Sequence, residues 1–265
     1  MTPPTNWLEV NVLYFQYFLL VLVRMTTMVA LAPLLGSRNV PIYVKIGLGF
    51  LLSIIIAPFV VREFPVMPDH FILFLGMVVR EGLVGILLGV LGAALFAAVQ
   101  LSGQIFGMMI GFGIVNVMDP LSELQISLLG QFEFLLAILL FLAVGGHHLL
   151  LMAMANSYAV IPVNTFAMTA PLAQQVGLIL GNMFTISFKV GFPMIAAIFL
   201  IKVSMGLIAR TVPQMNVFIV GLPLNIFVGL IVMGLSLTYV TFLLKNYFNQ
   251  FFVDLYVMWQ LAAGQ

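Results

Sequence analysis

The sequence predicts an all-α integral membrane protein, and three observations support this fold class. Hydrophobic residues make up 63% of the 265 residues, whereas charged residues make up only 6%. Six apolar runs reach the length of about 20 residues that a helix needs to cross a bilayer. The composition leaves too little polar surface for a water-soluble domain of this length.

The six predicted helical spans follow one another along the chain. They cover residues 12–35, 42–61, 71–99, 126–144, 172–201 and 217–244. Prolines fall mainly in the connections, where a missing amide hydrogen does least harm to a helix. The third and fifth runs are longer than a bilayer requires, which permits tilt or protrusion. We expect these helices to form hairpins within one domain.

Residues 103–120, GQIFGMMIGFGIVNVMDP, are as apolar as a membrane span but contain four glycines and three methionines. Gly103, Gly107 and Gly111 recur at every fourth position, which favours close packing of two helices. However, each glycine weakens a helix by about 0.8–1 kcal/mol relative to alanine. Irregular backbone at membrane depth is tolerated only inside protein or beside water. The other interpretation is therefore a segment that lines or blocks a passage.

Five ionisable side chains lie within the apolar runs: Arg24, Arg80, Glu81, Glu133 and Lys189. Each would cost about 2.5–3.5 kcal/mol at the centre of a membrane helix, so each should have a partner in protein or water. Arg80 and Glu81 are adjacent and therefore do not face one another on a helix. Salt bridges between helices or subunits are favoured over a proton or ion relay, because the carboxylates are scattered.

The third run contains glycines at three- and four-residue spacing along one helix face: Gly82, Gly85, Gly89 and Gly92. Two helix backbones can approach closely where side chains are this small. We therefore expect this face to be a packing interface within the chain or with another subunit.

The sequence contains no recognisable catalytic or cofactor-binding motif. His147 and His148 are neighbours, but without spaced Cys, Asp or Glu residues they indicate a helix end rather than a metal site. The chain has no cysteine, and its net charge of +1 includes no basic run of the kind that binds nucleic acid. We expect a protein that is not an enzyme and that holds no cofactor or metal.

Four segments, in order along the chain, resemble one protein family. They are SRNVPIYVKIGLGF (37–50), EGLVGILLGVLGAALFAAVQLSGQIFGMMIGFGIVNVMDP (81–120), GGHHLLLMAMANSYAVIP (145–162) and PQMNVFIVGLPL (213–224). These segments are similar to the FliR family of flagellar export-gate proteins, whose counterpart in virulence secretion is the SctT family. The long last segment and the VMDP ending favour the flagellar branch.

The resemblance implies a subunit of the entry portal of a type III secretion system, in the flagellar basal body of the bacterial inner membrane. The chain would assemble with FliP and FliQ around a channel for unfolded flagellar proteins, much of it displaced outward from the bilayer plane. FlhB would contact this core and FlhA would neighbour it. The single domain, 1–265, would combine a FliP-like part, 1–170, with a FliQ-like helical hairpin, 171–265.

The family's channel plug corresponds to residues 107–120 of this sequence. The implied plug residues are Gly107, Met108, Met109, Gly111, Phe112, Gly113, Ile114, Val117 and Met118. Methionine side chains fill irregular gaps, apolar side chains exclude water from a constriction, and glycines let the backbone bend. Asp119 and Pro120 are expected to terminate this loop, because proline cannot continue a helix at low cost.

Polar residues precede and enter the last apolar run. Gln214 and Asn216 lie just before it, and Gly221 and Pro223 are expected to interrupt it. Together with Asn225, these residues are expected to hold a helix junction. Two other classes of function remain open: a secondary transporter or ion channel with broken helices and buried charges, and a structural scaffold without a gating element.

Overall fold

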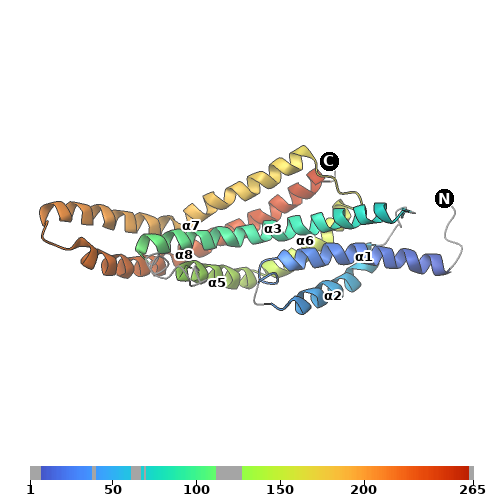
Figure 1. Ribbon diagram of the computed structural model, residues 1–265, viewed down its shortest axis with the longest axis horizontal. Coiled ribbons are helices and arrows are strands. Elements are labelled where there is room, and N and C mark those ends of the chain that lie inside the picture. The colour runs from blue at the N-terminus through green and yellow to red at the C-terminus, as the bar shows by residue number, and fades with distance from the viewer. Residues whose placement is uncertain (1–6, 38–39, 61–66, 69, 112–126, 263–265) are drawn as a thin grey trace. The chain divides into compact units, whose positions relative to one another are not determined.

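The computed structural model describes residues 7–37, 40–60, 67–68, 70–111 and 127–262, and every regular element in these ranges is an α-helix (Figure 1). The helices are α1 (Trp7–Leu31), α2 (Ile42–Val60), α3 (Phe71–Ile110), α5 (Leu128–Ala143), α6 (Gly146–Val160), α7 (Ala170–Thr211) and α8 (Val217–Ala262). Five of them are long and apolar enough to cross a membrane, or up to six if the bent pair α5 and α6 forms one span. The predicted all-α class is confirmed.

Several helices extend beyond the runs that predicted them. Helix α3 has 40 residues and continues through Ile110, whereas its apolar run was bounded at residue 99. At a rise of about 1.5 Å per residue, a helix of this length spans roughly 60 Å. Helices α7 and α8 are also long, with 42 and 46 residues. Each of these three helices is therefore longer than the hydrocarbon core of a bilayer, which is about 30 Å thick.

Helix α6 is the element that the sequence analysis does not identify. It follows α5 directly, with a bend of 69° between the two helices. Gly145 lies at the bend with φ of 72°, a left-handed conformation that glycine adopts at little cost. The glycine pair therefore separates two helices rather than ending one.

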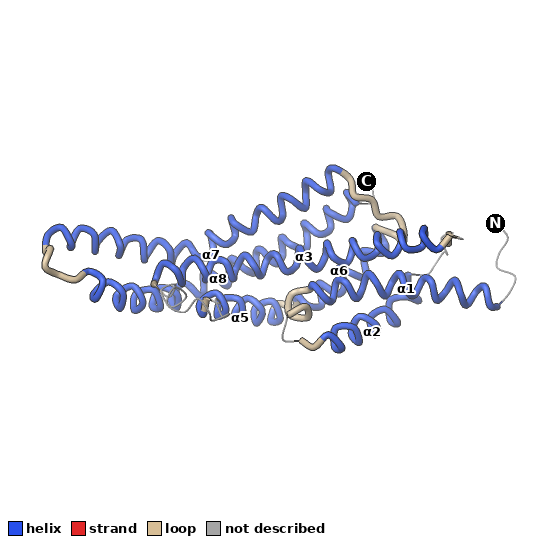
Figure 2. Tube along the Cα trace, in the orientation of Figure 1, coloured by secondary structure: helices blue, strands red, loops and turns tan. Residues whose placement is uncertain are grey.

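Helix α8 corrects the expectation that Gly221 and Pro223 interrupt the last run. The helix begins at Val217 and passes through both residues. Proline removes one backbone donor, the amide that would bond to the carbonyl of Ile219. The loss of one bond early in a 46-residue apolar helix does not end it. The chain instead reverses before α8, in the turn at residues 212–216 (Figure 2).

The chain divides into two compact units. Unit 1 comprises Met1–Ala94, Gly145–Leu180 and Gln250–Gln265, and unit 2 comprises Leu95–Val144 and Gly181–Asn249. Helices α3, α7 and α8 contribute to both units. The expected FliP-like and FliQ-like parts, 1–170 and 171–265, stay a prediction.

In unit 1, helix α1 packs against α2 and against the first half of α3. A Cβ atom added at Gly89 of α3 would lie 2.5 Å from Leu31 Cβ, and one at Gly92 would lie 3.1 Å from Pro33 Cδ. At Gly85, an added Cβ would collide with the backbone of α1 at Arg24. The glycine face of α3 therefore allows an approach to α1 that larger side chains would prevent. Gly82 lies on the same face, with an added Cβ 3.6 Å from Val23.

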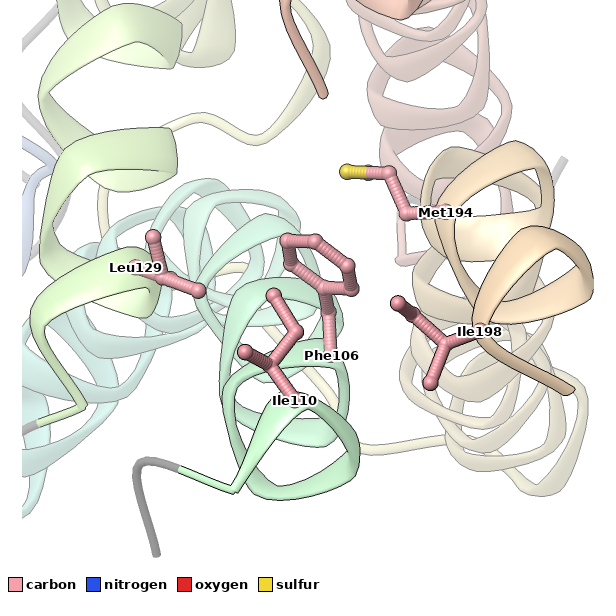
Figure 3. Packing of buried hydrophobic residues seen from close by; sticks show 5 residues of the cluster. All are labelled: Phe106, Ile110, Leu129, Met194 and Ile198. Atoms are coloured by element: carbon pink, nitrogen blue, oxygen red, sulfur yellow. The ribbon is translucent and has the colours of Figure 1, made fainter. Parts of the chain in front are cut away.

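The core of unit 2 joins the second half of α3 to α5, α7 and α8. Its central cluster comprises Phe106, Ile110, Leu129, Met194 and Ile198, all buried (Figure 3). A second cluster is aromatic, with the ring of Phe96 5.3 Å from that of Phe141 and 5.7 Å from that of Phe248. These contacts hold the end of α3 in place.

Candidate functional site

The predicted plug begins inside helix α3, which corrects the expected start of the loop. Gly107, Met108 and Met109 are helical, because α3 continues through Ile110. The helix ends at Ile110, and the next residue, Gly111, has φ of 111° and donates its amide to the carbonyl of Met108 at 3.2 Å. The other predicted plug and termination residues lie outside the described residues: Phe112, Gly113, Ile114, Val117, Met118, Asp119 and Pro120.

Close packing against α5 explains why α3 stays helical through its glycines. A Cβ added at Gly103 would lie 2.6 Å from the Cα of Gly130, and one at Gly107 would lie 2.7 Å from Ser127 Oγ. Ser127 caps α5 by accepting from the amide of Gly130, and its hydroxyl donates to the carbonyl of Gly103 at 3.3 Å. Helix packing is therefore the role of Gly103 and Gly107, whereas the positive φ of Gly111 fits a change in backbone direction.

The end of α3 has one anchored face and one exposed face. Phe106 and Ile110 are fully buried, whereas the side chain of Met108 is 63% exposed. Met109 is half-buried and packs against the central cluster of unit 2. The chain that follows Gly111 therefore leaves from a fixed helix end.

Arg24 and Glu81 form an ion pair in the interior of unit 1. Arg24 Nε donates to Glu81 Oε2 at 2.6 Å, and both side chains are fully buried. The guanidinium also donates to Ser157 Oγ and to the carbonyl of Ile161, both at 3.2 Å. It lies 4.1 Å from the centre of the Tyr158 ring, within the range of cation–π attraction. This network connects α1, α3 and α6.

Arg80 and Glu81 contact the same residue although they do not face one another. The amide of Asn164 donates to Glu81 Oε1 at 2.9 Å, and Arg80 Nη1 donates to Asn164 Oδ1 at 3.3 Å. Asn164 has φ of 68°, a conformation that asparagine tolerates better than most residues. The two adjacent charges therefore fix the turn after α6.

Glu133 and Lys189 belong to unit 2, whereas the other three charges belong to unit 1. Glu133 is buried in unit 2, and neither carboxylate oxygen has a hydrogen-bond partner among the described residues. Glu133, Phe132 and Met194 line a cavity of about 10 Å³. This volume is about what one water molecule needs. Lys189 is exposed on α7. Within the described ranges, Arg24 and Glu81 are the only two of the five that form an ion pair.

The residues expected at the last helix junction divide between the turn and helix α8. Gln214 and Asn216 lie in the turn before α8, and Asn216 Oδ1 accepts from the amide of Ile219 at 3.3 Å, as a helix cap does. Gly221 is buried inside α8, where an added Cβ would lie 3.6 Å from Met205 Cε. Asn216 therefore makes a contact at the junction, whereas Gly221 lies within α8.

His147 and His148 lie in the first turn of α6, with their rings 4.2 Å apart. No group of three or more His, Asp or Glu residues capable of holding a metal occurs in the described part of the chain.

Sequence reasoning missed three residues that hold the buried charges: Ser157, Ile161 and Asn164. Ser157 and Ile161 belong to α6 and its end, which contact Arg24 from 133 and 137 residues away along the chain. A turn at Asn164 could have been predicted, because asparagine shortly after proline is a typical turn residue that tolerates positive φ. No sequence signal pointed to the other two.

Comparison with known proteins identifies the family. The model of "Bacterial export proteins, family 1" matches residues 15–251. The chain is 35% identical to the flagellar biosynthetic protein FliR of Bacillus subtilis, covering 89% of this chain and 91% of that protein. It is 31% identical to FliR of Escherichia coli K12, covering 93% and 92%. These relatives are named as biosynthetic proteins of the flagellum rather than as enzymes. The chain belongs to the FliR family of bacterial flagellar export proteins.

Proposed function

We propose that the chain is a subunit of the flagellar export gate in the bacterial inner membrane. It assembles there with FliP and FliQ into a channel through which unfolded flagellar proteins cross, with FlhB and FlhA as neighbours. The observation that carries the proposal is the family match over residues 15–251, which runs from α1 into α8. A match of this extent supports a shared role for the whole chain rather than for one segment.

The exposed surface of unit 2 is consistent with a subunit that other membrane helices and lipid cover. Large aromatic side chains on α7 are more than half exposed, among them Phe184, Phe192 and Phe199. Phe227 and Phe242 on α8 are exposed to the same degree. A monomer in water rarely exposes so many large apolar side chains, and extensive exposed apolar surface marks interaction with lipid or protein.

The segment that begins at Gly111 is proposed to seal the resting channel against ions and to move aside for an export substrate. The buried side chains of Phe106 and Ile110 support this role, because they anchor the helix from which the segment leaves. A scaffold without a gating element would tolerate polar replacements of Phe112 and of Met108, whose side chain is exposed. A gate should lose ion tightness with the same replacements.

The partnership is tested by deleting the gene and restoring it with an affinity-tagged copy. The deletion should abolish secretion of flagellar proteins, and the tagged chain should restore secretion and co-purify with FliP and FliQ. Unchanged secretion in the deletion strain would contradict the whole function. Restored secretion without co-purification of either protein would contradict the assembly.

The flagellar role is favoured over a virulence role, because the relatives reported above are all flagellar biosynthetic proteins. The deletion strain should therefore lose its flagellar filaments. A transporter would instead move a solute when the chain alone is reconstituted into liposomes, whereas an export-gate subunit should require FliP and FliQ.

A further inference from the structure

A buried acidic side chain in unit 2 takes no part in the contacts described above. Glu133, on α5, is only 5% exposed, and both of its carboxylate oxygens have almost no accessible surface. Neither oxygen has a hydrogen-bond partner among the described residues. An isolated carboxylate in an apolar interior is costly, because burial removes its hydration and supplies nothing in return. Glu133 therefore needs either a counter-ion or a proton.

No counter-ion surrounds Glu133 in the described part of the chain. Helices α5, α7 and α8 line its small cavity, and the only polar side chain that they add is the hydroxyl of Ser236. On the α3 side, the hydroxyl of Ser102 lies beside the carboxyl. Lys189, the cation of α7 closest in sequence to this cavity, is exposed. Tyr239 of α8 is directed elsewhere, because its hydroxyl donates to the carbonyl of Lys189 at 3.4 Å.

Buried hydroxyl groups from the other helices of unit 2 lie close to this level. Ser102 Oγ faces α7, where it is 2.8 Å from a Cβ atom added at Gly191. Ser187 lies one turn before Gly191, and its buried hydroxyl also has no partner among the described residues. A hydroxyl can donate as well as accept, so serines can pair with either form of a carboxyl. They supply no positive charge, which favours the neutral form of Glu133.

We propose that Glu133 is a buried proton-binding site in unit 2 and holds its proton as a neutral carboxylic acid. The acidic hydrogen is donated to Ser102 Oγ. The cavity that Ser236 also lines has room for one water molecule, which pairs with the other carboxyl oxygen. A neutral carboxyl needs no counter-ion, in agreement with the apolar lining. The inference does not depend on the proposed function.

The site lies beside the contacts that fix the end of α3. Glu133 follows Gly130 by about one helical turn, and a Cβ added at Gly103 would lie 2.6 Å from the Cα of Gly130. Met194 lines the cavity and also belongs to the central cluster (Figure 3). Loss of the proton would place an unpaired charge next to these contacts and favour the entry of water. The bound proton therefore helps to keep α3, α5 and α7 packed.

Infrared spectroscopy tests the charge state, because a protonated carboxyl has a carbonyl stretch that a carboxylate lacks. At pH 6 a glutamate in water is ionised. The difference spectrum between the native chain and Glu133→Gln should nevertheless contain this band at pH 6. Asp254→Asn is the matched control, since it removes an exposed carboxyl that pairs with Gln250, and it should remove no such band. Ser102→Ala should move the band to higher frequency, because the carboxyl loses a hydrogen bond.

Thermal unfolding of the full chain counts the same proton. Glu133 is ionised in the unfolded chain at pH 6, so unfolding releases the proton that the folded chain holds. The stability that this proton contributes is present at low pH and is lost as the pH rises. One proton shifts the unfolding equilibrium about tenfold per pH unit. From pH 5 to pH 6, the midpoint should fall by about 3–5 °C more in the native chain than in Glu133→Gln.

Several outcomes would overturn the proposal. The spectra are recorded on the full chain alone and on the gate assembled with FliP and FliQ, and absence of the band in either sample would show an ionised Glu133. Loss of the band only in the assembled gate would indicate that a cation of another subunit pairs with it. Equal pH dependence of the two midpoints would also contradict a bound proton. Glutamine has nearly the shape of a neutral glutamic acid, so misfolding of Glu133→Gln would show that the charge is required. A band unmoved by Ser102→Ala would overturn the assigned contact.

Discussion

Replacing Arg24 by methionine should destabilise the protein strongly, and a second substitution should restore much of the loss. Arg24→Met leaves the carboxylate of Glu81 fully buried without its cationic partner, while the amide of Asn164 at 2.9 Å still donates to it. An uncompensated buried charge of this kind costs about 3–5 kcal/mol. Because unfolding midpoints of chains of about this size shift by about 2–4 °C per kcal/mol, the midpoint should fall by roughly 6–20 °C.

The rescue depends on removing the stranded charge while keeping its hydrogen bond. In the double variant Arg24→Met with Glu81→Gln, the glutamine carbonyl can still accept from Asn164, and no buried charge remains. The double variant should therefore recover more than half of the stability that Arg24→Met loses, although it carries one substitution more. Arg80→Gln is the control, since Arg80 is exposed and its loss should cost about 1 kcal/mol or less.

Thermal unfolding of the purified protein in detergent, followed by circular dichroism, measures these differences. The account requires that the single variant unfold at a lower temperature than the double variant. If the double variant were equally or less stable, the stranded charge would not be the source of the loss. Equal losses of stability in Arg80→Gln and Arg24→Met would also contradict the stranded charge as the source of the loss.

Three further substitutions test local features of the fold by the same unfolding measurement. Gly103→Ala should destabilise by about 1–3 kcal/mol, because its Cβ would lie 2.6 Å from the Cα of Gly130; Gly181→Ala, with open space, should be neutral or stabilising, and equal effects of the two would contradict the packing. Ser127→Ala should cost about 1 kcal/mol through loss of the α5 cap, and an unchanged midpoint would refute that role. Asn164→Ala should be more harmful than Asn164→Gly, because φ is 68° there and glycine adopts it freely, and the reverse order would contradict this conformation.

Hydropathy was sufficient to predict most helices, because a span in a bilayer must satisfy its backbone hydrogen bonds within the helix. It was insufficient at the end of α3, where the glycine content left an irregular segment open and the family resemblance placed the start of a loop at Gly107. The missing contribution is the contact of Gly103 and Gly107 with α5, whose nearest residues are Gly130 and Ser127. The energy of such a contact depends on where another helix lies, which local propensity does not contain.

The buried charges also show that local sequence does not identify contacts between distant helices. The cost of a charge in an apolar run indicates that Arg24 needs a partner, but many acidic and polar residues could serve. Its actual partners, Glu81, Ser157 and Ile161, lie 57, 133 and 137 residues further along the chain. Helix α6 brings the last two into place, and its start after Gly145 resembled a helix end. The need for a partner was therefore predictable, whereas its identity required the fold.

The most direct test of the central claim is the ion permeability of cells that contain the assembled gate with residues 112–118 deleted. This deletion begins beyond α3 and leaves Phe106, Ile110 and Gly111 in place. The account predicts that the membrane potential falls when the variant is produced together with FliP and FliQ, and that it stays normal when either partner is missing. An assembled gate of normal composition with an unchanged membrane potential would contradict the sealing role.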